Sequence, residues 1–490
     1  MASANIAFDG IPSSIRKPGK YFEFNTRLAV RTLPGNPQRL LCLAQKLASG
    51  SQPALMPVDV FSDEQAAQLF GRGSYAHRMA RAAITANPYL QLTLLAVEDA
   101  PGSVAAVGGV LLAGTATSSG QIQVAVGNNS VSLGISAGML ASDIAIQLTT
   151  LLNAQDLPVL ATAVPLSSSS LPFNVPSQIT SSGHSVVLTA RHKGAQGNAI
   201  PVSTWCSAGG ITHLVNAMVG GAVDPDYASA LAAVAGAGHH IIAAPLSTQA
   251  HLTALRTHLD FVSGPLEQRG AVGAFGWPGT LATGTTLAGQ INSGRISGAW
   301  HRGSLCLPCE IAAAYAAVLA SEEDPARPLN TLPLAGLDVT AITAQPMRTE
   351  QENALANGLT PLEVGPGDKV QIVRALTTYT KDPQGVADVS LLDVTTIRTL
   401  DYVRKAVRER ISLRFPREKL SERTPAKVRS EALDVLVKLE ELEIVEAVEA
   451  NKDGLLAERD SQDVNRLNLK IPCDVVNGLH VIAGRIDLLL

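Results

Sequence analysis

The chain has 490 residues, is 46% hydrophobic but only 4% aromatic, and carries a formal net charge of −4. This length can hold two to four domains, and the slight acidic excess argues against a nucleic-acid binder, which needs basic residues for phosphate contacts. No secretory signal is evident at the start, no run has the roughly 18 apolar residues of a membrane span, and five cysteines do not suggest a disulfide framework, so a reducing cytoplasm is expected.

The first 38 residues predict an extended arm. Prolines and glycines are frequent before Tyr21 and return in LPGNP, and the one strand-like stretch is KYFEFNTRLAV. A single strand cannot bury a core. We therefore expect residues 1–38 to lie outside the folded body.

An α/β core is expected to follow the arm. RLLCLAQ (39–45) and QLTLLAVED (91–99) are apolar runs typical of buried strands. One helical stretch is expected between them, with Ser62 as its N-cap and Gln65 at the capping-box position. We assign residues 39–100 to the first part of this core.

The pattern changes near Ala100. GQIQVAVGNNSVSLGI alternates polar and apolar residues on both sides of Asn128 and Asn129, which is typical of a half-buried β-hairpin. A helix is expected over 141–153, followed by further alternating strands that end in HSVVLTARHKG. We expect an inserted β-rich outer domain over 101–205.

From about Tyr227 the chain is expected to return to the core. Apolar strand-like runs (HHIIAAPL, GAVGAFGW and RISGAW) alternate with helical patterns. This order indicates an α/β fold with a doubly wound, mostly parallel sheet, to which the two early strands also belong. Residues 206–365 are assigned to the second part of the core.

The last region is strongly charged. Residues 381–490 carry 18 Lys and Arg and 20 Asp and Glu, so we expect a charged α+β assembly domain over 366–478. It contains a basic helix (LLDVTTIRTLDYVRKAVRERISLRF) and a second helix with Thr424 as its cap and Pro425 at its first position. A strand-like arm over 479–490 closes the chain.

Two neighbouring segments of this domain have opposite charge. Residues 398–429 hold 11 basic and 4 acidic residues, and residues 431–463 hold 3 basic and 11 acidic ones. Solvated helix faces with pairs four residues apart are the simplest explanation. The alternative is head-to-tail contact between identical chains, or docking on a charged partner.

GISAG (134–138) has the letters of a hydrolase nucleophile elbow, G-x-S-x-G, with Ser136 as the nucleophile. Such an elbow follows a buried central strand, whereas the strand here alternates and belongs to a hairpin. We therefore interpret Ser136 as the end of that strand. No catalytic residue is predicted.

Cys306 and Cys309 stand at the start of an expected helix, where a redox dithiol would be placed. A thioredoxin-like fold needs a compact βαβ unit around such a pair. A zinc site needs a second pair of ligands, and Cys206 and Cys473 are isolated in the sequence. Packing of the helix entry is the favoured interpretation.

His239 and His240 begin an apolar strand, so their side chains point to opposite faces and do not easily share one metal ion. The sequence has no Walker A, HExxH or G-x-G-x-x-G pattern. We predict no enzyme, no cofactor and no metal site. The alternative is a serine or thiol hydrolase, or an oxidoreductase, that uses Ser136 or the Cys306/Cys309 pair.

Several segments, in order and over nearly the full length, carry a family resemblance. They are IPSSIRKPGKYFEF, LTARHKGAQGNAI, VGAFGWPGTLATGTTLAGQINSGRIS, ENALANGLTPLEV, KVQIVRALTTYT, DVTTIRTLDYVRKAVRERI and DVNRLNLKIPCDVVNGLHVIAGRIDLLL. With these segments the chain resembles the contractile tail sheath protein of Mu-like bacteriophages. No single piece is a chemical signature, so the specificity lies in their order and coverage.

The resemblance implies a structural, non-enzymatic role. Sheath subunits stack as six-membered rings around a tail tube, and the stack shortens to drive the tube through the host envelope. The implied partners are other copies of the chain, the tail tube protein, and baseplate and tail terminator proteins, with no nucleic acid and no direct membrane insertion. The implied location is the virion tail, after assembly in the host bacterial cytoplasm. A static capsid or tube component is a further possibility, but a tube protein is usually one small β-barrel.

The resemblance also suggests assembly residues. Terminal arms in such proteins add strands to neighbouring sheets, which makes the apolar arm residues the self-assembly candidates: Tyr21, Phe22, Phe24, Val481, Ile482, Ile486 and Leu488. The basic helix is the candidate for the face towards the tube, through Arg404, Lys405, Arg408, Arg410 and Arg414. Its apolar stripe, Val403, Val407 and Ile411, is expected to pack inward. Sheath–sheath contacts or solvation remain the alternative for these charges.

Overall fold

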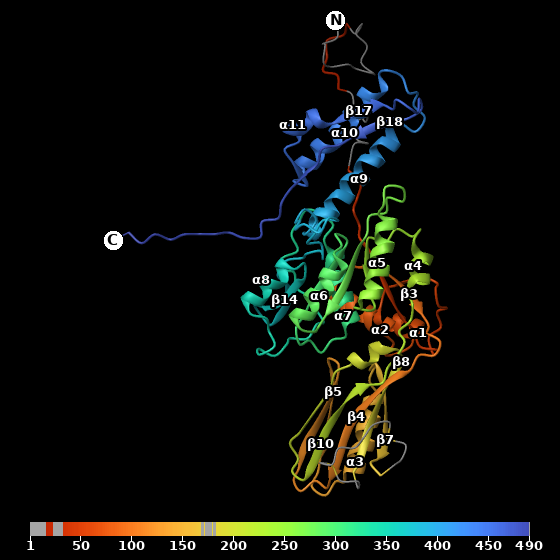
Figure 1. Cartoon of the computed structure of the whole chain (residues 1–490), viewed down its shortest axis with the longest axis vertical. Coiled ribbons are helices and arrows are strands. Elements are labelled where there is room, and N and C mark those ends of the chain that lie inside the picture. The colour runs from red at the N-terminus through yellow and green to blue at the C-terminus, as the bar shows by residue number, and fades with distance from the viewer. Residues whose placement is uncertain (1–15, 23–32, 168–170, 172–178, 180–182, 490) are drawn as a thin grey trace. The chain divides into compact units, whose positions relative to one another are not determined.

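A computed structural model describes residues 16–22, 33–167, 171, 179 and 183–489 of the chain. The chain forms two compact units. The larger unit holds Asn36–Tyr402 and Asp474–Leu490, and the smaller unit holds Met1–Gly35 and Val403–Cys473. Figure 1 colours the elements of both units in chain order.

The larger unit is an α/β fold built on an eight-stranded mixed sheet with the order β15-β14-β13-β12-β11-β1-β3-β2. The six inner strands run parallel, whereas the edge strands β15 and β2 pair antiparallel with their neighbours. The strands are β1 Arg39–Gln45, β2 Val58–Val60, β3 Gln91–Val97, β11 Ile241–Ala243, β12 Val272–Trp277, β13 Ile296–Trp300, β14 Thr360–Gly365 and β15 Lys369–Ile372.

Helices cover both faces of this sheet, because alternate strand residues enter two different apolar cores. In β1, Leu40 and Cys42 belong to one core, and Leu41 and Leu43 belong to the other. Burial on both faces explains why the strands are continuous apolar runs in the sequence. The first core includes α1 Asp63–Phe70, α2 Tyr75–Ala86 and α7 Pro308–Ser321, and the second includes α4 Ala228–Val234, α5 Gln249–Val262, α6 Leu281–Ile291 and α8 Arg348–Ala356.

The single helical stretch expected between β1 and β3 is in fact two helices, α1 and α2. Ser62 is the N-cap of α1, as predicted, and its hydroxyl accepts the N–H of Gln65. Gly71 and Gly73 separate the helices with φ values of 89° and 78°, a conformation that glycine adopts without strain. A Cβ at Gly73 would also collide with the carbonyl oxygen of Leu157 in the inserted domain.

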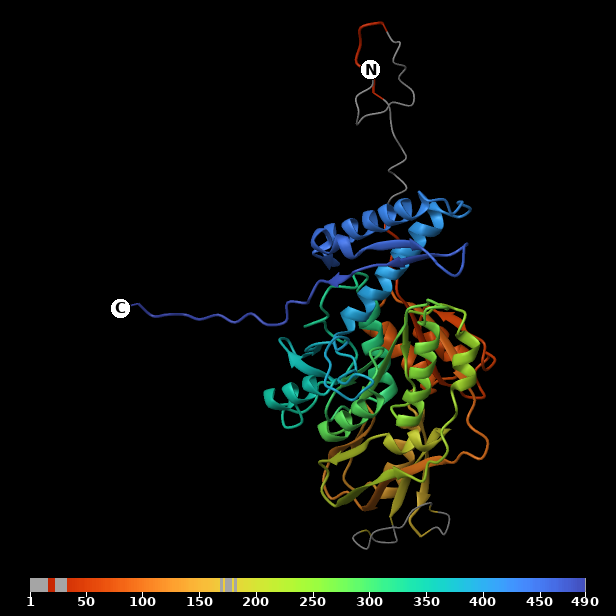
Figure 2. The same cartoon turned by 45° about the horizontal axis from the view of Figure 1, so that its top comes forward.

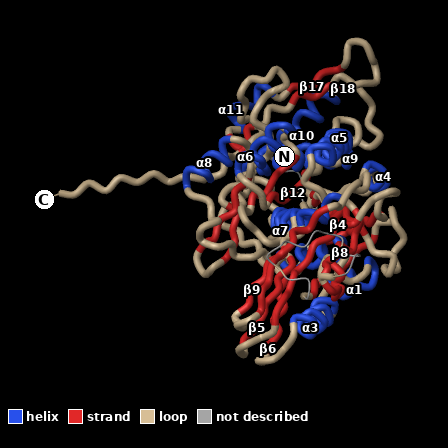
Figure 3. The backbone as a smooth tube through the Cα atoms, turned by 60° about the horizontal axis from the view of Figure 1, so that its bottom comes forward, coloured by secondary structure: helices blue, strands red, loops and turns tan. Residues whose placement is uncertain are grey.

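The inserted domain contains a four-stranded sheet, β10-β4-β8-β7, and a three-stranded sheet, β6-β5-β9 (Figure 3). It continues past residue 205, because β10 pairs antiparallel with β4 and a bridge joins Val104 to Ala222. The expected end at 205 was therefore too early. The elements are β4 Ala105–Gly114, β5 Gly120–Val126, β6 Asn129–Ile135, α3 Ala141–Asn153, β7 Val159–Pro165, β8 His184–Lys193, η2 Ala195–Ala199, β9 Val202–Cys206 and β10 Ile211–Val219.

The charged C-terminal unit begins later than expected, because the chain up to Tyr402 belongs to the larger unit and not to a domain that starts at 366. In the smaller unit α10 lies along the β17–β18 hairpin (Figure 2). Thr424 is the first residue of α10 and not its cap, and its hydroxyl donates to the carbonyl oxygen of Lys419. The remaining elements are α9 Val394–Arg414, α10 Thr424–Glu441, β16 Val445–Glu446, α11 Val448–Asn451, η3 Lys452–Gly454, β17 Leu456–Arg459, β18 Leu467–Lys470 and β19 Asp474–Val475.

Candidate assembly surfaces

The C-terminal arm is held at its base and exposed beyond it. His480 Nδ1 lies 2.9 Å from Asn330 Nδ2, and His480 Nε2 lies 3.6 Å from Asp393 Oδ1. From there to residue 489 the chain is extended and forms no helix or strand (Figure 1). The four predicted assembly residues of this arm are 80%, 83%, 99% and 83% exposed, in the order Val481, Ile482, Ile486 and Leu488.

Such exposure is costly for four large aliphatic side chains so close in sequence. Burying one of them contributes about 1.5–3 kcal/mol, and exposed apolar groups that cluster usually mark an interaction site. The arm therefore has the composition of a strand that needs a partner sheet.

The N-terminal arm is described only in part. Over residues 16–22 it has no helix or strand. The Tyr21 hydroxyl donates to the carbonyl oxygen of Lys17 at 3.1 Å, while Phe22 is almost fully exposed. Phe24 lies outside the described residues.

In the part of the chain that the structure describes, β17 and β18 form a sheet of two strands. Among the described residues no third strand pairs with it, and an isolated two-stranded hairpin is only marginally stable in water. Arg429 of α10 supports it by donating to the carbonyl oxygens of Leu455 and Lys452 at 2.7 and 2.8 Å. A strand from another chain, added at an edge of this hairpin, would form hydrogen bonds with the backbone N–H and C=O groups there.

The turn between β17 and β18 was not predicted from the sequence. The Asp460 carboxylate accepts the N–H groups of Asp463 and Gln462 and the Asn468 side-chain amide. These hydrogen bonds lower the pKa of Asp460 to about 2. Aspartate often bonds the backbone two or three residues further on in a turn, so the D-S-Q-D run was the available signal.

The five basic residues proposed to face the tube have different surroundings. Arg410 is buried, and its Nη1 lies 2.8 Å from Asp434 Oδ2 and 3.2 Å from Glu431 Oε2 on α10. Arg414 Nε lies 3.6 Å from the same Glu431. The basic and acidic segments thus contact each other within one chain.

The other three candidates lie nearer the start of α9. Lys405 Nζ donates to the carbonyl oxygen of Gly35 at 2.9 Å. Arg404 is partly buried and Arg408 is exposed. Val403 and Val407 are buried as the apolar stripe predicted, and Ile411 is partly buried.

Two domain families match this chain. Residues 220–378 match the phage tail sheath protein central domain, and residues 386–488 match the phage tail sheath C-terminal domain. The Mu-like prophage FluMu tail sheath protein of Haemophilus influenzae is 33% identical over 507 residues, which cover 99% of this chain and 100% of that protein. The chain belongs to the phage tail sheath family. It is a subunit of a contractile tail sheath.

Solved structures of sheath tail proteins share the fold of this sheath subunit. The protein from Desulfitobacterium hafniense aligns with a TM-score of 0.51 and 13% identity, covering 94% of this chain and 97% of its own. The protein from Listeria innocua aligns with a TM-score of 0.50 and 14% identity, covering 91% and 94%. Identities this low show the common mixed α/β fold alone.

Ser136 of the sheath subunit is exposed and follows the last residue of β6, as we interpreted it. Its N–H donates to Met139 Sδ at 3.2 Å, and Gly138 has a φ of 92°. β6 pairs with β5 in an antiparallel hairpin, and this is not the parallel central strand that a nucleophile elbow follows.

Cys306 and Cys309 are free thiols buried at the start of α7. Burial raises the pKa of both thiols. A reactive cysteine needs the opposite, an exposed position and a lowered pKa. Packing of the helix entry, the favoured interpretation, fits this geometry.

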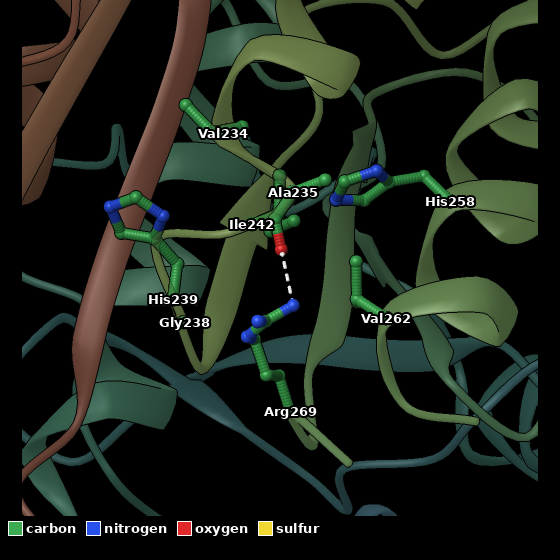
Figure 4. Close-up of a pocket in the computed structure, with 8 residues that line it drawn as sticks. All are labelled: Val234, Ala235, Gly238, His239, Ile242, His258, Val262 and Arg269. Atoms are coloured by element: carbon green, nitrogen blue, oxygen red, sulfur yellow. Dashed lines mark hydrogen bonds between the residues drawn. The ribbon is translucent and has the colours of Figure 1, made fainter. Parts of the chain in front are cut away.

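His239 and His240 have separate surroundings. Burial lowers the pKa of His239 to about 4, and His240 Nδ1 accepts the N–H of Arg39 at 3.2 Å. His239 and His258 line a pocket of about 10 Å³, and Arg269 beside them donates to the carbonyl oxygen of Ala235 (Figure 4).

Among the described residues no group of three or more His, Cys, Asp or Glu is placed to hold a metal ion. In the same part of the chain no helix is long and apolar enough to cross a membrane.

Proposed function

We propose that this sheath subunit polymerises around a tail tube as stacked rings of six, and that the stack shortens to drive the tube through a bacterial envelope. The observation that carries the proposal is the exposed apolar arm beyond His480, together with a β17–β18 hairpin that no third strand of the described residues joins. The arms of one copy would pair with the hairpin of a neighbour, which is β-augmentation.

The energetics favour a lattice over a dimer. A six-residue strand adds about six hydrogen bonds, each worth a net ~0.5–1.5 kcal/mol. Ordering its residues costs ~1–2 kcal/mol each, so hydrogen bonds alone leave one docked arm close to balance. Burial of Val481, Ile482, Ile486 and Leu488 would tip that balance. Each copy gives and receives arms, and linked contacts strengthen one another through effective concentration.

Contacts through arms also suit a contracting assembly. Rigid bodies can rotate and slide while the strands that connect them stay paired. On this proposal the mixed α/β unit moves as a body, and the arms keep neighbouring copies linked in both the long and the short sheath.

The proposed partners are the tail tube protein, at the inner face of the sheath, and baseplate and tail terminator proteins at its ends. We propose Arg404, Lys405 and Arg408 of α9 for tube contact. Arg410 and Arg414, the other two candidates, pair with Glu431 of α10. The subunit would assemble in the host cytoplasm, act in the virion, and need neither nucleic acid nor membrane insertion.

We also propose that the subunit has no catalytic role. The supporting observations are the hairpin position of Ser136 and the buried thiols of Cys306 and Cys309. Ser136→Ala and the double variant Cys306→Ala/Cys309→Ala should leave tail assembly and infectivity unchanged. A thousandfold loss of infectivity with normal assembly would overturn this assignment.

Negative-stain electron microscopy of the purified full-length protein tests the assembly proposal. Striated tubes or rings of uniform diameter are expected once the protein is concentrated. A field of single particles at every concentration and salt condition would contradict it.

A further inference from the structure

The inserted domain is almost without charge. Residues 101–222 contain four charged side chains, Asp143, Asp156, Arg191 and Lys193, whereas about 25% of the residues of a typical soluble domain are charged. Its other exposed side chains include Ser, Thr, Asn and Gln, together with larger apolar residues such as Leu140, Ile146 and Trp205.

Three of the four charges lie where the domain meets the body of the larger unit. Asp156 Oδ2 is 2.9 Å from Arg81 Nη2 on α2. Arg191 donates to the carbonyl oxygen of Leu157, which faces Gly73 at the start of α2. Lys193 donates its N–H to the carboxylate of Asp99.

The fourth charge, Asp143, lies in the first turn of α3, which packs against β6, β7 and β8. None of the four belongs to the three-stranded sheet β6-β5-β9 (Figure 3).

Most residues on one face of that three-stranded sheet are exposed, and none of them is charged. In the register Gln123 pairs with Trp205 on one side and with Ser132 on the other. Paired residues of antiparallel strands project to the same side, so these three side chains form one row across the sheet. The next row is Ser130, Ala125 and Ser203, and Gln121 pairs with Gly134 beyond the first row.

The opposite face is apolar and buried. Its buried residues include Ile122, Val124, Val126, Val131 and Ile135. The strands therefore have one clear inner and one clear outer side. Trp205, on the outer side, is 52% exposed.

The polar groups around Trp205 have no partners in the described part of the chain. The side chains of Gln121, Gln123, Ser130, Ser132 and Ser203 form no hydrogen bond with any described residue. Their amides and hydroxyls can both donate and accept, and they stand beside an aromatic ring that is half open to solvent.

The chemistry of this face selects one kind of partner. Phosphate or acidic ligands need Arg or Lys, and basic ligands need carboxylates, but the face has neither. A wholly apolar partner needs a contiguous apolar patch, and Trp205 is the one large apolar side chain in these rows. An uncharged sugar fits, because its C–H face can stack on an indole while its hydroxyls exchange hydrogen bonds with amides and hydroxyls.

We propose that the outer face of the β6-β5-β9 sheet binds an uncharged polysaccharide chain of a bacterial cell surface. Trp205 is the stacking platform, and Gln121, Gln123, Ser132 and Ser203 supply the hydrogen bonds. The choice of a cell-surface source rests on the proposed function, which brings the sheath against a bacterial envelope. The lack of charge on the face then matches the lack of charge on the ligand.

The test uses the full-length protein on an array of purified bacterial O-polysaccharides and capsular polysaccharides with known repeats, some uncharged and some acidic. The wild type should bind one or more uncharged polysaccharides with a signal that is equal at low and high salt, because no ion pairs are involved. Trp205→Ala should weaken this binding about tenfold or more, as expected for a central aromatic contact. Trp205→Phe should retain part of it.

Tyr89→Ala is the matched control, because Tyr89 is an exposed aromatic residue on the body of the larger unit, outside the inserted domain. It should bind as the wild type does. Binding of acidic repeats alone, no binding to any uncharged repeat, or equal binding by Trp205→Ala would each overturn the proposal.

Electron microscopy of the same samples separates this proposal from the assembly proposal. Trp205→Ala should still form tubes. Loss of tubes in this variant would mean that the face is a contact between copies of the chain, and would overturn the glycan site. Absence of tubes in the wild type would contradict the assembly proposal, while the array result would still decide the glycan site.

Discussion

Arg78 Nη2 lies 2.7 Å from Glu310 Oε1, and the two side chains are only 2% and 8% exposed. Arg78 Nη1 also donates to the carbonyl oxygen of Asp156 in the inserted domain. Glu310 Oε2 accepts the N–H of Leu307 at the start of α7. One buried ion pair thus connects α2, α7 and the inserted domain.

Arg78→Met should lower the free energy of unfolding by about 3–5 kcal/mol, because it leaves the Glu310 carboxylate buried without its partner. The double variant Arg78→Met/Glu310→Met should regain much of the loss. Arg72→Met is the control, since that guanidinium is 57% exposed and its ion pairs are worth at most about 1 kcal/mol. Urea unfolding measures all three, and equal losses for Arg78→Met and Arg72→Met would contradict the role of the buried pair.

Two buried histidines should make the fold sensitive to acid. Burial lowers the pKa of His251, which contacts Tyr227 edge-on, to about 4, and that of His239 to about 4. In the unfolded chain a histidine has a pKa of about 6.5. The folded state therefore keeps its full stability above about pH 6.5 and loses it as the pH falls towards 4, because only the unfolded state gains the protons.

The free energy of unfolding that the protein loses between pH 6.5 and 4 should be smaller in His251→Phe by up to about 3 kcal/mol. The free energy of unfolding, measured across that range, gives the slope. Thr253→Val, at an exposed position on the same helix, is the control and should leave the slope unchanged because it removes no titratable group. A slope in His251→Phe as steep as in the wild type would show that His251 is not kept neutral by the fold.

The true bounds of the inserted domain can be tested by deletion. Val104 and Ala222 exchange backbone hydrogen bonds at 3.0 and 3.1 Å, so a short linker can replace residues 105–221. This deletion should give a soluble body, less stable than the parent because Arg78 loses its contact with Asp156. Deletion of 101–205 should give insoluble protein, because β10 loses its partner β4. The soluble fraction of each deletion variant after expression is the measurement. A soluble 101–205 deletion together with an insoluble 105–221 deletion would contradict the assigned bounds.

The sequence pattern alone predicted those elements whose structure depends mainly on neighbouring residues. A few neighbouring residues predicted the strand β1, the hairpin turn near Asn128 and the N-cap at Ser62. The structure confirms all three. The failures depend on distant contacts. β10 is placed by β4, which lies far earlier in the chain, and the break before α2 is fixed where Gly73 meets Leu157.

The same distinction holds for the assembly surfaces. The strand-like apolar sequence at the end of the chain predicted an arm that no other element covers. Its apolar side chains, such as Val481 and Ile486, are exposed. The positions of the basic residues in the α9 sequence could not show that Arg410 pairs with Asp434 on α10, because the two helices meet only in the folded chain. Which of the remaining charges faces a tube stays a prediction.

Charge reversal on α9 separates tube binding from folding. Arg404→Glu/Arg408→Glu should reduce co-sedimentation of the sheath with purified tail tubes, more at low salt than at high salt, because salt screens exposed charges. Arg410→Met should instead lower the stability of the smaller unit, since it leaves Glu431 and Asp434 without their buried partner. Normal loading of Arg404→Glu/Arg408→Glu on tubes at both salt concentrations would exclude a tube contact at these residues.

Truncation of the arms tests most directly whether they hold the sheath together. Removing residues 1–26 or 479–490 takes away the arm side chains that we propose for strand exchange, whereas removing Leu490 alone is the control. Electron microscopy across a concentration series, with circular dichroism to verify folding, is the measurement. We predict that each truncated protein is a folded monomer that forms no tubes at any concentration, while removal of Leu490 alone leaves tubes intact. Tubes of normal diameter from both truncated proteins would show that contacts between the bodies hold the sheath together and that the arms are incidental.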